Sequence, residues 1–422
     1  MIAASIDRAR RLSSGPAVVS AARLGPGSAH ASTLDNLRLE IISGRDSFDA
    51  LGPDWSRLYD RAGPAGQPFQ SFAWSWHWAN HFLEPAGTLR ASRTTLHILV
   101  AWRGEDLVLV WPLVRVRNRG IVELRFLGDP VGEYGDALVD PGLPALPLLR
   151  TAWSFLIARS KADVVVLGNV REDAAIGPLM AENGAVTTRV EGAPYMDFTG
   201  AKDYEAYMSR FSGRSRSTRR RKRAKLAEAG PLTHRTLNSG SEARQAAREI
   251  LELKRKWQLD KGIVSRSLCD PRTANFFADV ADGLGHDTGC RIMTLDCAGK
   301  MVAAELTFVA KDRLVNHVLV YDVDHDRHSP GALLTDDSIQ ACFAGGIVRY
   351  DFMGPANGYK LDWSDAITTV TDYAVPMSLK GRFWVHAYLS YGRERLKRLV
   401  AALPASVRRG LASSLAVVLP GM

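Results

Sequence analysis

The spacing of apolar residues along the chain alternates between a strand period and a helix period. Short apolar runs typical of strands cover residues 36–44, 96–102, 107–114, 122–127, 162–168, 290–296, 301–310, 314–321 and 347–353. Helical spacing covers residues 46–62, 69–82, 144–160, 241–259, 271–284 and 330–344. Strands therefore alternate with helices in both halves of the chain, which predicts an α/β protein with mixed sheets.

Turn signals and a repeated pattern predict two domains. Ile121–Gly128 resembles Ile347–Gly354, and a hairpin signal precedes each segment. The same order of elements in both halves indicates two copies of one fold. We expect a flexible extension over 1–35, domains over 36–194 and 195–381, and a helical tail over 382–422.

Charge is concentrated in one segment. The chain carries 54 Lys and Arg against 45 Asp and Glu, and Arg210–Lys225 alone holds nine basic residues and no acidic one. This excess predicts a helix running to about residue 229 that meets an anionic partner. A solvated basic face is the simpler alternative, and duplex nucleic acid is disfavoured because no aromatic residue beyond Phe211 interleaves with the charges.

Cysteine content and hydropathy bear on the compartment. The chain has four cysteines without a CxxC pair, which fits a reducing cytoplasm. No apolar run approaches the ~20 residues that span a bilayer. The tail over 382–422 mixes basic and apolar residues, so it either packs on the second domain or makes a peripheral membrane contact.

An ordered series of motifs marks the second half. Tyr321-Asp322 precedes Ser329–Leu334, and Tyr350–Gly354 precedes Tyr359-Lys360 and Trp363. The series resembles the GNAT-fold acetyltransferase family that contains the cellulose-biosynthesis (CelD-like) proteins, a relative of FemAB-type double-GNAT transferases. The resemblance extends from Phe69 to Trp363. It implies tandem GNAT-like domains and acetyl-CoA or another acyl-CoA as the donor.

The donor site is expected where a helix begins after the strand ending at Tyr321. Helix N-termini present free N–H groups and the positive end of a dipole, which suits a pyrophosphate. In GNAT enzymes the pyrophosphate of the cofactor lies at the equivalent place. The residues expected to hold it are Ser329, Gly331, Ala332, Leu333 and Leu334. The alternative is an ordinary helix start with Ser329 as the cap.

Acyl transfer also needs a base and a proton donor. Asp351 stands in an otherwise apolar strand, where burial would raise the pKa of its carboxyl, and Glu305 is a second candidate base. Tyr359 could protonate the leaving thiolate. Each of these side chains could instead have a structural role.

Five basic or aromatic residues are candidates for binding the acceptor. Lys360 could bind an anionic acceptor, while Arg219 and Arg220 of the basic helix could bind a phosphorylated one. Trp257 and Arg266 are suggested by the family pattern of a basic and aromatic helix end followed by a loop. The expected acceptor is a small molecule or a glycan precursor.

Metal sites are not indicated. His77 and His81 share a helix face without a third ligand. Asp322, Asp324 and Asp326 resemble the start of a calcium loop, but Arg327 stands where glycine is required.

Three functions remain open at this point. The first is acyl transfer from acyl-CoA to a sugar, a polysaccharide precursor or an amine. The second is FemAB-like transfer of an aminoacyl group from charged tRNA. The third is a non-catalytic GNAT-fold partner in polysaccharide biosynthesis.

Overall fold

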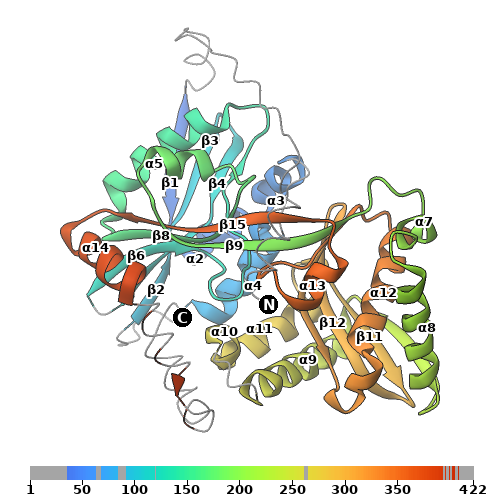
Figure 1. Ribbon diagram of the computed structural model, residues 1–422. Coiled ribbons are helices and arrows are strands. Elements are labelled where there is room, and N and C mark those ends of the chain that lie inside the picture. Colours follow the sequence, from blue (N-terminus) through green and yellow to red (C-terminus); the bar gives the residue numbers. More distant parts are fainter. Residues whose placement is uncertain are drawn as a thin grey trace. The chain divides into compact units, whose positions relative to one another are not determined.

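The computed structural model describes residues 36–62, 68–83, 92–118, 120–260 and 265–392, with residues 395, 399, 402, 403 and 407 beyond them. The predicted N-terminal extension and most of the predicted tail lie outside these residues. The chain divides into two compact units, of which the first comprises Met1–Pro194 with Gly354–Glu394 and the second Tyr195–Met353 with Arg395–Met422 (Figure 1).

The first unit contains two sheets. The smaller sheet has the order β1-β3-β4-β7, and the larger one runs β9-β15-β8-β6-β5-β2. Its strands are β1 (Leu37–Ile42), β2 (Ser92–Leu96), β3 (Ile98–Arg103), β4 (Asp106–Trp111), β5 (Leu113–Asn118), β6 (Ile121–Phe126), β7 (Leu138–Val139), β8 (Val164–Arg171), β9 (Val186–Asp197) and β15 (Ala366–Pro376). Its helices are α2 (Arg45–Ala50), α3 (Gly52–Arg61), η1 (Pro68–Gln70), α4 (Phe72–Phe82), α5 (Ala145–Ser160), α6 (Gly177–Glu182), α13 (Gly358–Trp363), α14 (Leu379–Phe383) and η3 (Trp384–Gly392).

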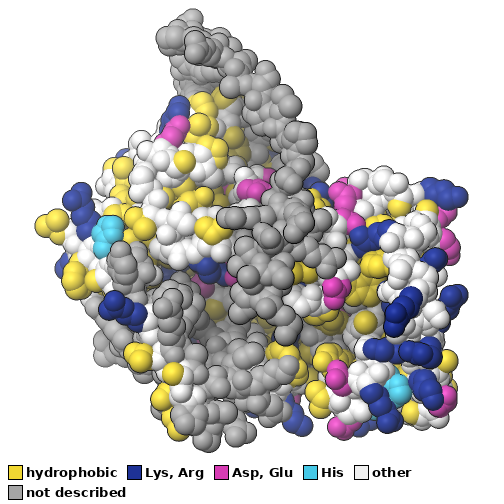
Figure 2. Space-filling view, viewed as in Figure 1, with side chains coloured by type: hydrophobic (Ala, Val, Ile, Leu, Met, Phe, Trp, Pro, Cys, Tyr) yellow, Lys and Arg dark blue, Asp and Glu magenta, His cyan; other side chains and the backbone are white. Residues whose placement is uncertain are grey.

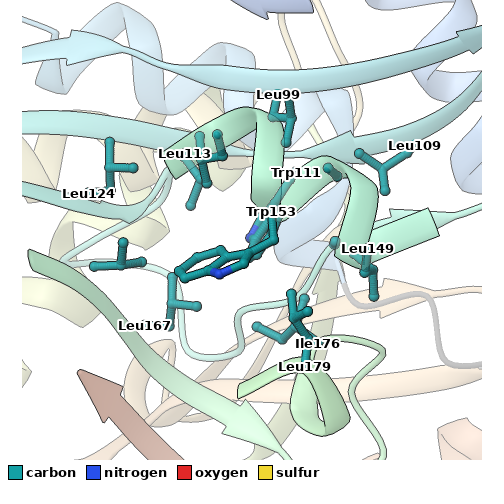
Figure 3. Close-up of a cluster of buried hydrophobic side chains, with 14 of the residues drawn as sticks. Leu99, Leu109, Trp111, Leu113, Leu124, Leu149, Trp153, Leu167, Ile176 and Leu179 are labelled. Atoms are coloured by element: carbon teal, nitrogen blue, oxygen red, sulfur yellow. The ribbon is translucent and has the colours of Figure 1, made fainter. Parts of the chain in front are cut away.

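The core of the first unit lies between α5 and the sheets. Trp111 and Trp153 have ring centroids 6.0 Å apart, and leucines from the five strands β3, β4, β5, β6 and β8 lie around them (Figure 3). These apolar residues recur at the strand and helix periods of the sequence. The apolar positions that predicted these strands and helices are therefore the ones that form the core.

The second unit is built on one sheet. The strand order is β10-β11-β12-β13-β14, followed by Tyr195–Asp197 at the end of β9. Its strands are β10 (Leu232–Leu237), β11 (Cys290–Cys297), β12 (Lys300–Ala310), β13 (Arg313–Tyr321) and β14 (Arg349–Asp351). Its helices are α7 (Tyr204–Met208), α8 (Gly213–Ala227), α9 (Gly240–Asp260), α10 (Arg266–Cys269), α11 (Pro271–Asp282), η2 (Val323–His328) and α12 (Pro330–Ala344). Helices α9 and α11 lie on one side of β11 and β12, and α12 with α8 on the other (Figure 1).

The two units repeat one strand–helix–strand arrangement. In the first, β6 is followed by α5 and by β8, which pairs parallel with β6. In the second, β13 is followed by α12 and by β14, which pairs parallel with β13. The inferred repetition of the fold is confirmed. The sequence echo behind it was misaligned, however, because it matches β6 with β14, whereas β6 occupies the place of β13.

The pairing of the last strand, β15, explains why the first unit includes residues from the end of the chain. Residues 354–381 fall in the predicted second domain, yet β15 pairs antiparallel with β8 from Val370 to Pro376. The last residues of β9, Tyr195–Asp197, belong to the second unit and pair there with β14. Short-range pattern shows that a strand exists, but it does not show which strand will be its neighbour.

Two predicted helices have other bounds in the structure, for local chemical reasons. The helix predicted over 46–62 breaks at Leu51, because Gly52 and Pro53 begin the separate helix α3. The helix predicted from residue 69 begins at Phe72, where the Ser71 side chain accepts a hydrogen bond from the Trp74 N–H. Trp74 and Trp78, one turn apart on α4, are both buried.

Candidate functional site

The parallel strands β13 and β14 diverge soon after they pair. Their pairing covers only Arg313–Val315 with Arg349–Asp351, and β13 then continues for six residues to Tyr321. Beyond Val315, no pairing with β14 is present in the described part of the chain. An edge of β13 is thus open over its second half.

Backbone groups on this edge point into the opening. The Asp322 N–H donates to the Val302 carbonyl of β12, and the register places Val320 opposite Ala304. In an antiparallel pair, residues that bond to the neighbouring strand alternate with residues whose N–H and C=O groups face away from it. The main-chain groups of Leu319 and Tyr321 therefore face away from β12, toward the open edge.

Helix α12 begins beside this edge with an unusual residue. Ser329 precedes Pro330 in the left-handed conformation (φ 50°, ψ 55°) and its side chain does not cap the helix. The expectation of an ordinary serine cap is therefore wrong. The Ser329 hydroxyl instead accepts a hydrogen bond from the Lys222 ammonium, with 2.5 Å between Oγ and Nζ.

A pocket of about 350 Å³ opens at this point between α8 and the start of α12. Its wall contains three basic side chains and, among the residues described there, no acidic one. The lining residues are Ser212, Arg214, Ser215, Thr218, Arg219, Lys222, Ser329, Ala332 and Leu333. A cation beside a helix N-terminus is disfavoured unless an anion is bound there too. The electrostatics of the pocket thus suit an anionic ligand.

Helix α8 has two basic faces with different surroundings. Ser215, Arg219 and Lys222 share the inner face, where Arg219 Nη1 donates to Ser215 Oγ at 3.1 Å. Arg223 anchors the helix, since its Nη2 donates to Asp337 Oδ1 of α12 at 2.6 Å. Arg220 is exposed and does not line the pocket. Of the two predicted arginines, the structure places Arg219 alone at the pocket.

Of the residues predicted to bind the donor, some line the pocket and others are buried away from it. Ser329, Ala332 and Leu333 line the pocket, whereas Leu334 is fully buried in the core under α12. Gly331 is buried as well, and a Cβ there would approach the Tyr321 ring at 3.4 Å. Its missing side chain therefore makes room for Tyr321 within the protein.

Glu305 lies at the point where β13 and β14 part. It has no exposed surface, and its carboxylate accepts hydrogen bonds from Ser338 at 2.5 Å and from Tyr350 at 2.8 Å. Asn316 Nδ2 donates to it at 3.0 Å. Burial raises the pKa of the Glu305 carboxyl, although the bonds from Ser338 and Tyr350 oppose that rise. The network joins β12, β13, β14 and α12.

Asp351 lies on the other side of the sheet from Tyr350, because successive strand residues face opposite ways. Its side chain is 4% exposed, and its Oδ1 accepts a hydrogen bond from the Met353 N–H at 2.7 Å. Asp351 is therefore held at the end of β14, next to the opening.

The remaining predicted residues lie in several places. Tyr359 and Lys360 belong to α13 of the first unit, where Tyr359 is exposed and Lys360 Nζ donates to the Gly354 carbonyl at 3.0 Å. Trp257 lies on α9, with the Lys254 ammonium 5.0 Å from its ring centroid. Arg266 begins α10, and its side chain is outside the described ones.

Lys254 of α9 is a further basic residue beside β13. Its Nζ lies 3.4 Å from the Leu319 carbonyl oxygen, on the open edge of β13. Burial lowers the pKa of this ammonium group. Lys222 and Asn316 are polar residues of this region to which the sequence analysis gave no role. For Lys222, its spacing with Ser215 and Arg219 on one helix face was the available signal.

No group of three or more His, Cys, Asp and Glu side chains in the described part of the chain is arranged to hold a metal ion. Within the same residues, no helix is long and apolar enough to cross a membrane.

Comparison with known proteins agrees with this architecture. A family model described as an acetyltransferase (GNAT) domain matches residues 213–361, from the start of α8 into α13. The protein has a GNAT fold. No curated protein matches the chain in sequence.

Several solved structures resemble most of the chain. FemX is 10% identical, with a TM-score of 0.55 over 83% of this chain and 100% of its own. A tandem GNAT protein from the clavulanic acid biosynthesis pathway is 13% identical, with a TM-score of 0.44 over 81% and 99%. L-PGS from Bacillus licheniformis is 11% identical, with a TM-score of 0.47 over 82% and 97%. Of these three, FemX supports the fold, and at 10% identity it supports the fold alone. The narrower likeness to CelD-like proteins stays a prediction.

Proposed function

We propose that the second unit transfers an acyl group from an acyl-CoA to an amine or hydroxyl acceptor. The observation that carries the proposal is the Lys222 ammonium, bonded to Ser329 in a cationic pocket at the N-terminus of α12. A GNAT domain match over 213–361 includes every residue of this pocket except Ser212.

The donor would be held by its phosphates. A pyrophosphate in the pocket would meet Lys222, Arg219 and the first turn of α12, which together supply two full positive charges and a helix dipole. The thioester end would then extend toward the open edge of β13. Acyl-CoA chemistry of this kind needs no metal ion.

The transfer step would take place at that edge. The acceptor attacks the thioester carbonyl carbon, and the main-chain N–H groups of Leu319 or Tyr321 stabilise the oxyanion. Collapse of the intermediate breaks the carbon–sulfur bond and releases the thiolate of CoA. Asp351 would take the proton of the acceptor, and Glu305 would position Tyr350 and Ser338, because its own oxygens are enclosed in the network.

The acceptor would approach from the side of the sheet that bears α9. Asp351 and Lys254 both lie there, and Trp257 is next to Lys254. A sugar or an envelope polysaccharide precursor in the cytoplasm fits these groups. Carbohydrates stack on aromatic rings, and their hydroxyl groups form hydrogen bonds with charged side chains. Arg266 stays a predicted contributor to acceptor binding, and the roles predicted for Tyr359 and Lys360 stay predictions.

Release of free thiol from acetyl-CoA in the presence of pooled amine and sugar acceptors tests the proposal. We expect acceptor-dependent release that Asp351→Asn lowers by about 100-fold or more. Asp279→Asn removes a carboxylate from the surface of α11 and should release thiol at the wild-type rate. Saturable binding of acetyl-CoA with no release for any acceptor would point to the non-catalytic alternative.

A FemAB-like reaction is the second candidate. Arg216, Arg220 and Arg221 are exposed on the outer face of α8, where they could contact the phosphates of a charged tRNA. The fold similarity to FemX is the reason to test it. Filter binding of tRNA should then weaken steeply with salt, and Arg216→Ser/Arg221→Ser should reduce the slope by about two.

A further inference from the structure

The helical segment from Leu379 to Gly392 exposes large apolar side chains. Leu379 is 82% exposed and Phe383 is 75% exposed, although both are among the residue types most often buried. They are four residues apart in α14, so they lie on the same face of the helix. Hydrophobic and basic side chains lie side by side at the place of α14 in Figure 2.

The opposite face of this segment is already occupied. Val385 and Leu389 are buried against Val164 and Ala374 in a core cluster of the first unit. Gly381 is buried too, and the N-terminus of α14 is capped by Ser378, which also donates to Asp163 Oδ1. Leu379 and Phe383 are thus presented outward by a helix whose inner face is fixed.

The charges around the exposed pair have one sign. Lys380 and Arg382 are exposed, and at 100° per residue they flank the line through Leu379 and Phe383 on its two sides. His386 follows on the exposed side. The sequence has no acidic residue from Tyr373 to Arg393, and from Tyr373 to Met422 it has eight Lys and Arg against one Glu.

We infer that α14 with the start of η3 is a docking surface for an anionic lipid bilayer. An apolar pair flanked by cations is the pattern of helices that lie in the membrane interface, with aromatic and aliphatic groups inserted and basic groups at the lipid phosphates. A protein partner fits less well, since lysine is depleted from the centres of protein interfaces. This inference is independent of the proposed acyl transfer.

Flotation of the full-length protein with lipid vesicles tests the inference. One set of vesicles contains phosphatidylglycerol and phosphatidylcholine in equal amounts, and the other contains phosphatidylcholine alone. The protein should float with the first set and stay unbound with the second. Leu379→Ser/Phe383→Ser should lower the partition coefficient by about ten-fold or more. Lys380→Glu/Arg382→Glu should lower it by at least about 25-fold, at roughly five-fold for each cation lost.

Two control variants separate this surface from other parts of the molecule. Leu284→Ser removes a leucine that is 65% exposed in the second unit and should leave flotation unchanged. Arg216→Ser/Arg221→Ser removes cations from the exposed face of α8 and should reduce flotation less than the α14 variants do. Circular dichroism should show every variant folded, since each change is at an exposed position.

Three results would overturn the inference. The first is no flotation of the wild-type protein with phosphatidylglycerol vesicles. The second is flotation that the α8 variant abolishes and the α14 variants leave intact. The third is a dimer in sedimentation velocity that Leu379→Ser/Phe383→Ser converts to a monomer without any change in flotation, because the occupant of the surface would then be a second copy of the chain.

Discussion

The Lys222 ammonium lies 2.5 Å from the Ser329 hydroxyl and thereby brings a positive charge to the N-terminus of α12. Ser329 adopts a left-handed backbone conformation that is costly for any residue with a Cβ, and its side chain gives up the usual capping bond. Neither feature stabilises the helix start. The charge of Lys222 and the conformation of Ser329 are both explained if the N-terminus of α12 binds an anion.

Replacement of Ser329 should therefore affect the stability of the protein and its affinity for acetyl-CoA differently. Ser329→Gly removes the strain of the left-handed conformation, so the free energy of unfolding should rise or change by less than about 1 kcal/mol. The same variant should bind acetyl-CoA more weakly, because Lys222 loses its partner. Chemical denaturation and calorimetry measure the two effects. Ser329→Ala keeps the strain and serves as the matched control, and equal affinity in all three proteins would contradict the assigned role.

The buried carboxyl of Glu305 should make stability depend on pH. Burial raises its pKa above the ordinary value of 4.5. The folded protein then holds the proton more tightly than the unfolded chain. Stability from this group is fully present below pH 4.5 and is lost as pH rises toward the folded pKa. Relative to Glu305→Gln, the free energy of unfolding of the wild-type protein should fall over that range.

Asp140→Asn is the control for this measurement. Burial alone would raise the pKa of Asp140, but hydrogen bonds from Arg61 and the Gly142 N–H lower it overall below its ordinary value of 3.8. Above pH 4.5 Asp140 is ionised in both states, so its substitution should shift stability by a constant amount. A pH-independent difference between wild type and Glu305→Gln would show that burial does not control this carboxyl.

Helix α14 should depend on the absence of a side chain at Gly381. A Cβ there would collide with the backbone carbonyl oxygen of Asp163, which cannot rotate away. Gly381→Ala should lower the free energy of unfolding by about 1–3 kcal/mol. Gly177→Ala, at the start of α6, meets nothing within 4 Å and should be neutral or slightly stabilising. Thermal denaturation of both variants compares them, and equal melting temperatures would show that α14 is not packed as described.

The sequence was most informative where local chemistry decides the structure. The helical spacing over 271–284 predicted α11, and the helix begins at Pro271, where the Asp270 side chain accepts a hydrogen bond from the Arg272 N–H. The fold class and its repetition followed from the order of strands and helices. The misaligned echo of β6 with β14 shows the limit, since strand residues are similar everywhere and pairing is decided by distant parts of the chain.

The site was predictable in outline only. Ser329 and Ala332 were found because a helix start after a strand is a recognisable local motif. Glu305 was predicted to be a second candidate base, while its enclosure depends on Ser338, Asn316 and Tyr350 from three other elements. The bond between Lys222 and Ser329 joins residues 107 positions apart, and no local pattern encodes it.

Calorimetric titration of acetyl-CoA into wild-type protein, Lys222→Ala and Arg220→Ala tests the central claim most directly. We predict saturable binding to the wild-type protein, a loss of about ten- to hundred-fold for Lys222→Ala, and little change for the outward-facing Arg220→Ala. Equal affinity for wild type and Lys222→Ala, or no binding to the wild-type protein, would contradict the assignment of the donor site.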